Sequence, residues 1–151
     1  MTTLETTDLK TRVANWTQTY ADTITENYRR YHINQLTRDS HPYPDYAREQ
    51  LDEIKNGTAK LMKFKIKTGK KFYKIVSLEY EVANDYYNRK AGYRERTVHA
   101  FVDKETGQVY KPASWRAPAK HVRYDMRIIK EREFLFNPNN TGWAGGYLYL
   151  R

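Results

Sequence analysis

The chain has 151 residues, no cysteine, and 27 Lys and Arg against 18 Asp and Glu, which gives a formal net charge of +9. This length fits one domain with a helical extension and can bury a sizeable core. The lack of cysteine excludes disulfides and thiolate metal sites, and no stretch approaches the roughly eighteen consecutive apolar residues of a membrane span. Because the N-terminus also lacks the basic and apolar regions of a signal peptide, we expect a soluble cytoplasmic protein.

The first part of the chain predicts one long helix. Thr2 and Glu5 have the spacing of a capping box at its start. Apolar residues then recur every three or four positions, as expected for a helix of about thirty residues and roughly 45 Å. Such a helix either folds across a sheet or overhangs it as an assembly arm. The stripe comprises Leu9, Val13, Trp16, Tyr20, Ile24, Tyr28 and Tyr31.

A second, shorter helix is predicted from Asp45 to Lys55, after the break at residues 40–44 and before the stop at Asn56 and Gly57. Residues 1–60 therefore form a helical N-terminal segment, either in the same domain as the rest or as an assembly arm. Residues 61–151 are predicted to form a basic antiparallel β domain with an aromatic C-terminal tail.

Positive charge is concentrated in this second part. Residues 1–60 hold eight Lys and Arg against nine Asp and Glu, whereas residues 61–151 hold nineteen against nine. A net charge of −1 is thus followed by one of +10, which points to an anionic partner for the β domain.

Two lysine-rich strands carry the densest charge. Lysines at 63, 65 and 67 alternate with apolar residues, and after a turn at Thr68 and Gly69 a strand returns from Lys70 to Val82. Like charges on neighbouring strands repel, so a bound anion would stabilise them. The alternative is that the lysines protect an edge strand from aggregation. The six lysines are Lys63, Lys65, Lys67, Lys70, Lys71 and Lys74.

A third strand is predicted from Tyr93 to Asp103, followed by a turn that ends at Gly107 and a short returning strand that ends before Pro112. The next segment combines an aromatic ring with cations, which is typical of surfaces that pair phosphates and stack bases. The ring either stacks in this way or plugs the core under the hairpin. These residues are Trp115, Arg116, Lys120 and Arg123.

This stretch resembles a family of small proteins of tailed bacteriophages, cyanophages included. The shared pattern runs from Val98 to Tyr124 and contains VHAFVD, TG, VYKPASW and APAK, followed by an Arg. The family has no established activity. The resemblance implies a phage-encoded protein that acts in the cytoplasm of the infected host cell, and it assigns no catalytic residue.

Residues 121–132 fit a strand by alternation, with a helix ending near Glu133 as the alternative. After a loop at residues 137–142, the chain ends in an aromatic tail. Such a tail either packs into its own core or pairs with a neighbouring molecule. The tail comprises Trp143, Tyr147, Leu148, Tyr149 and Leu150.

We therefore predict an α+β fold in which a long N-terminal helix and a short helix pack on a curved antiparallel sheet of four to six strands. We expect no catalytic residue, cofactor or metal. The leading hypothesis is a nucleic-acid-binding protein that uses the lysines and the Trp115 cluster. The alternative is a protein–protein module that uses the long helix and the aromatic tail, either as a virion or assembly component or as a small factor that modifies a host protein. Its partner would be a host or virion protein, or a second copy of the chain in a homo-oligomer. A metal-dependent nuclease would need carboxylates such as Glu79, Glu81 and Asp85, although Glu79 and Glu81 would also pair with nearby lysines.

Overall fold

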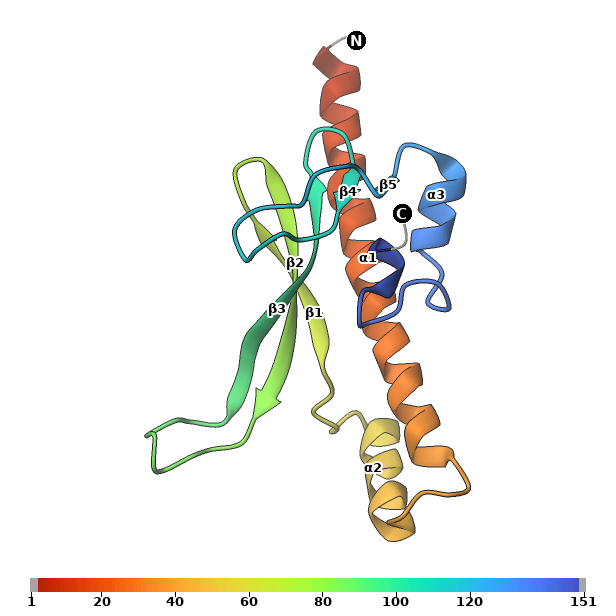
Figure 1. The fold of residues 1–151 in the computed structure, drawn as a ribbon, viewed down its shortest axis with the longest axis vertical. Helices are drawn as coiled ribbons and strands as arrows, with labels where there is room; N and C mark the ends of the chain where they lie inside the picture. The colour runs from red at the N-terminus through yellow and green to blue at the C-terminus, as the bar shows by residue number, and fades with distance from the viewer. Residues whose placement is uncertain (1–2, 150–151) are drawn as a thin grey trace.

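The computed structural model describes residues 3–149, with side chains from residue 8 onward (Figure 1). A long helix, a short helix and an open five-stranded antiparallel sheet confirm the α+β prediction. The described part excludes Thr2 and the side chain of Glu5, so the predicted capping box at the start of the helix stays a prediction. It also excludes Leu150 of the predicted aromatic tail. The helices are α1 (Thr3–Thr37), α2 (Pro44–Asn56) and α3 (Ile129–Leu135), and a 3₁₀ helix, η1 (Gly146–Leu148), lies near the end of the chain.

The sheet is a meander in which each strand pairs with its neighbour in sequence. The order is β1-β2-β3-β4-β5, so β1 lies at one edge. All pairs are antiparallel. The strands are β1 (Lys63–Thr68), β2 (Phe72–Glu81), β3 (Gly92–Asp103), β4 (Gln108–Tyr110) and β5 (Tyr124–Asp125).

Helix α1 runs the length of the molecule and packs its apolar stripe on one face of the sheet (Figure 1). Val13, Tyr20 and Ile24 are fully buried, and they share one core with Phe64 of β1 and Ile75 of β2. The predicted stripe thus packs on the chain's own sheet from Leu9 to Tyr28, whereas Tyr31 at its end is exposed. Within residues 3–149, no helix combines the length and the apolar character needed to cross a bilayer.

The prediction of a strand over most of residues 121–132 is wrong. Only Tyr124 and Asp125 form a strand, and the chain then turns into α3. Tyr124 and Met126 are buried in the core, but Val122 and Ile128 at the two ends of the alternation are exposed, so the buried face covers only the middle of the segment. The position of α3 is fixed through Arg132, whose guanidinium carbon lies 4.4 Å from the centre of the Trp16 ring of α1.

The aromatic tail packs into the core of its own chain. Tyr147 and Leu148 are buried, and the Trp143 ring meets the Tyr28 ring of α1 edge-on with the ring centres 5.3 Å apart. The backbone N–H of Trp143 also donates a hydrogen bond to Asn27 Oδ1 at 2.9 Å. The tail thus binds to α1, which leaves Tyr149 as its exposed aromatic residue among those described.

A chain of buried polar groups joins α1, β3 and the tail. The hydroxyl of Tyr147 forms hydrogen bonds with that of Tyr20 and, at 2.7 Å, with Nε2 of His99. Burial lowers the pKa of His99 to about 4, although a hydrogen bond with the backbone of Trp143 opposes the shift. Burial also raises the pKa values of Tyr20 and Tyr147, so the network is uncharged at neutral pH.

We predict that this histidine makes the fold acid-sensitive. Between about pH 6.5 and pH 4, unfolded His99 binds a proton that the folded chain excludes, so the free energy of unfolding falls as the pH is lowered. The full difference amounts to roughly 3 kcal/mol. Urea denaturation at several pH values should show this slope in the wild type and a flatter profile for His99→Gln. Parallel profiles would contradict the prediction.

Candidate functional site

The lysine row of β1 lies on the face of the sheet that points away from α1. The inward side chains of Phe64 and Ile66 force this arrangement, because successive residues of a strand point to opposite faces. Lys67 lies directly opposite Lys74 of β2, so two like charges are cross-strand neighbours as predicted. Because β1 is also an edge strand, the edge-protection interpretation applies to its lysines as well.

The lysines at the far end of β1 already have partners on the sheet. Lys63 Nζ lies 4.1 Å from the centre of the Tyr93 ring, and Lys65 Nζ forms an ion pair with Glu95 at 3.0 Å. Lys67 Nζ also pairs with Glu95, at 3.1 Å. Hydrogen bonds from Lys65 and Lys67 lower the pKa of the Glu95 carboxyl, which therefore stays charged and neutralises part of the row.

The segment between β4 and β5 forms a small closed loop that presents Trp115. A β-bridge joins Pro112 to Pro118, and the N–H of Ala119 donates to the carbonyl of Lys111 at 2.8 Å. Inside the loop, Ser114 Oγ accepts hydrogen bonds from the backbone N–H groups of Arg116 and Ala117. The two prolines thus close a tight loop.

Trp115 lies on the outer face of the sheet with 40% of its surface exposed, so the alternative in which it plugs the core is wrong. The Nζ atoms of Lys74 and Lys67 lie 4.9 Å and 5.7 Å from the centre of its ring. An aromatic face attracts a cation at such distances. The ring therefore stabilises the two lysines that face each other across β1 and β2.

Beside Trp115, the end of the β1–β2 hairpin and the loop enclose a cleft of about 350 Å³, which we call the outer cleft. Its lining comes from three separate segments of the chain and includes five cationic side chains. No carboxylate occurs among the described residues that line it. The lining residues are Lys67, Thr68, Gly69, Lys70, Lys71, Phe72, Lys74, Phe101 and Arg116.

The structure thus divides the predicted site residues. Lys67, Lys70, Lys71, Lys74 and Arg116 line the outer cleft, and Trp115 lies over two of these lysines. The other four predicted residues lie outside the described lining of this cleft, and Arg123 is tied to β4 by a 2.7 Å bond from its N–H to the carbonyl of Val109. These four are Lys63, Lys65, Lys120 and Arg123.

A second cleft, of about 590 Å³, lies between the same hairpin and α1, and we call it the helix-side cleft. Sequence analysis missed Lys10 and Lys104, because they belong to α1 and to the β3–β4 turn and carry no local signal. Lys104 also holds the β1–β2 turn in place, since its Nζ donates to the carbonyl of Gly69 at 3.0 Å. The lining residues are Lys10, Lys70, Lys71, Tyr73, Lys104 and Glu105.

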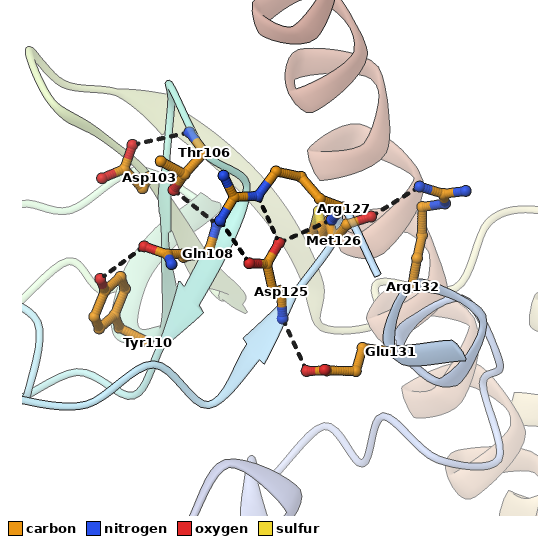
Figure 2. A network of polar contacts seen from close by, with 9 residues as sticks. All are labelled: Asp103, Thr106, Gln108, Tyr110, Asp125, Met126, Arg127, Glu131 and Arg132. Carbon is orange, nitrogen blue, oxygen red and sulfur yellow. Dashed lines mark hydrogen bonds and ion pairs between the residues drawn. The ribbon is translucent and has the colours of Figure 1, made fainter. Parts of the chain in front are cut away.

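A polar network around Asp125 fixes both ends of the Trp115 loop (Figure 2). The Asp125 carboxylate accepts hydrogen bonds from Arg127 Nε at 3.0 Å and Nη2 at 2.7 Å, and its backbone N–H donates to Glu131. A side-chain hydrogen bond connects Asp125 to Gln108 of β4, which also accepts a bond from the Tyr110 hydroxyl. The strands that precede and follow the loop are thereby held together.

Two of the three carboxylates of the nuclease alternative, Glu79 and Glu81, form ion pairs with arginines. Glu79 pairs with Arg96 at 3.2 Å, and Glu81 pairs with Arg89 at 3.5 Å. The prediction of lysine partners is wrong, because the pairing of β1 with β2 ends at Leu78, before these carboxylates. Among the residues that the structure describes, no group of three or more His, Asp or Glu could hold a metal ion.

Fold and clefts together define an α+β protein with a cationic surface built on the end of a β-hairpin. The chain belongs to a family of unknown function, DUF7717, which it matches over residues 1–150. No curated protein and no solved structure matches it.

We predict that Asp125→Asn destabilises the fold by about 1 kcal/mol at neutral pH, because the half-buried carboxylate loses its charge and the exposed Arg127 loses a charged hydrogen-bond partner. Burial alone would raise the pKa of Asp125, but the bonds from Arg127 lower it overall. The stabilisation is therefore lost as the pH falls below the ordinary value of about 3.8. Denaturation at several pH values should show a difference in the free energy of unfolding between wild type and variant that shrinks in acid. Asp52→Asn, at an exposed position of α2, is the matched control. Equal stability at neutral pH would contradict the role of the network.

Proposed function

We propose that this protein is a non-catalytic nucleic-acid-binding protein whose phosphate contacts are mostly independent of base sequence. The observation that carries the proposal is the outer cleft, where five cationic side chains gather beside a half-exposed tryptophan. Phosphate neutralisation by Lys and Arg supplies most non-specific affinity for nucleic acids, and aromatic rings add stacking with any base.

Crowding of like charges favours an anionic ligand. Lys67 and Lys74 are directly opposite each other, and Lys70 and Lys71 follow in the turn between their strands. Each ammonium group raises the free energy of its neighbours, and a phosphate placed among them removes that cost. Lys67 and Lys74 are also held in place by Trp115, so less side-chain entropy is lost when a ligand binds.

The resemblance over residues 98–124 supports a phage-encoded protein that acts in the cytoplasm of the infected host cell, with DNA or RNA as its partner. Charge neutralisation and stacking account for the proposed binding without a cofactor, a metal or a catalytic residue.

A second candidate function is contact with a host or virion protein, or with another copy of the chain. The observation that favours it is the tip of the β2–β3 hairpin (Figure 1). Tyr86 and Tyr87 lie between these strands and are 88% and 67% exposed. Asn84 fixes this tip, because its Oδ1 accepts hydrogen bonds from the N–H groups of both tyrosines. A stable assembly that ignores oligonucleotides would favour this function over the first.

We predict that Lys70→Glu with Lys71→Glu abolishes most oligonucleotide binding, since both side chains line both clefts. Fluorescence anisotropy at several salt concentrations should show a wild-type affinity that falls steeply with salt. Loss of two phosphate contacts should reduce the logarithmic salt slope by about 1.4 to 1.8. The matched control is Lys55→Glu with Lys130→Glu, which changes the net charge equally at exposed helix positions. Equal binding by both double variants would attribute the affinity to net charge alone.

We predict that Trp115→Ala weakens binding by about 1–3 kcal/mol, the usual contribution of one stacked base. Trp115→Phe should recover part of this loss, because it keeps an aromatic face. Binding should quench wild-type tryptophan fluorescence, and the quenching should shrink in Trp115→Phe. Unchanged quenching in that variant would show that no base stacks on Trp115.

A further inference from the structure

The two cationic clefts lie on opposite faces of the same hairpin and meet at its turn. Phe72 and Lys74 point to the outer face, whereas Tyr73 between them packs toward α1. Lys70 and Lys71 line both clefts. The turn that separates the clefts spans only residues 69–71, which is about 10 Å of chain.

The helix-side cleft is suited to an anionic chain. Lys10 reaches it from α1 and Lys104 from the β3–β4 turn, so four lysines surround it together with Lys70 and Lys71. Lys104 Nζ lies 5.6 Å from the centre of the Tyr73 ring while it donates to the turn, so its charge is fixed at the cleft wall. One carboxylate, Glu105, also lines the cleft, 3.9 Å from Lys10 Nζ.

We infer that one single strand of nucleic acid crosses the β1–β2 turn from the outer cleft into the helix-side cleft, which adds Lys10 and Lys104 to the binding residues. This inference rests on the proposed function and narrows it to single strands. The path changes from one face of a hairpin to the other within about 10 Å. A duplex stays stiff over about 150 base pairs and cannot follow such a bend, whereas a single strand is flexible enough to do so.

The position of Glu105 beside Lys10 means that changes at these two residues should have opposite effects on the affinity for a strand that follows this path. A phosphate near Lys10 is attracted by that lysine and repelled by Glu105, and both groups are more than half exposed. Removal of the lysine charge should weaken binding and removal of the carboxylate should strengthen it. If the strand does not reach Lys10 and Glu105, these two changes should affect binding no more than equal changes of charge elsewhere on the surface do.

The test compares anisotropy binding of a labelled oligothymidylate of about 12 nucleotides, of a labelled thymidine dinucleotide and of a duplex of about 12 base pairs to the full chain. We expect the longer single strand to bind more tightly than the duplex. Lys10→Glu should weaken its binding roughly five- to tenfold, and Glu105→Gln should strengthen it about two- to fivefold. The dinucleotide, which is too short to reach across the turn into the second cleft, should respond to neither change. Lys130→Glu and Glu49→Gln are the matched controls at exposed helix positions.

The outcomes separate this inference from the proposed function. If the wild type binds and the Lys70, Lys71 double variant does not, but Lys10→Glu and Glu105→Gln bind as the wild type does, the strand stops at the outer cleft and the inference is overturned. Equal affinity for the duplex overturns it as well. If the wild type binds no oligonucleotide even at low salt, the proposed function itself fails.

Discussion

Burial of the apolar face of α1 against the sheet determines which side of every strand faces solvent. Phe64 and Ile75 belong to that core, so their neighbours along β1 and β2 must point the other way. A slip of one residue would bury Lys65 and Lys67, and the cost of two uncompensated charges in an apolar core forbids it. The same packing that holds the fold together therefore concentrates cations on the outer face of the hairpin.

The rest of the chain limits the repulsion that results. Glu95, which lies on β3, neutralises part of the charge of Lys65 and Lys67 on β1. The Trp115 ring attracts Lys67 and Lys74. The network around Asp125 holds the strands on both sides of the Trp115 loop, so a polar cluster remote from the lysines helps to position the ring above them (Figure 2). The network that stabilises β4 and β5 therefore also positions the Trp115 loop at the candidate site.

Sequence periodicity predicted the elements that have one buried face, such as α1, α2 and β1. It failed at residues 121–132, because only Tyr124 and Met126 of the alternating apolar residues are buried and the chain turns after Asp125. The clustering of Lys67 to Lys74 was visible in the sequence because these residues are close along the chain. The participation of Lys10 and Lys104 was not, because it depends on how α1 and the β3–β4 turn cross the hairpin end.

The two interpretations of the lysines, edge protection and anion binding, are each favoured by a different end of the same hairpin. At the Lys63 end, an edge strand carries charges that already have partners in Tyr93 and Glu95, which suits protection from edge-to-edge pairing. At the turn, Lys70 and Lys71 face two clefts whose described lining contains one carboxylate, Glu105. An anion gains most where cations are crowded and least neutralised, so electrostatics alone directs it to the turn.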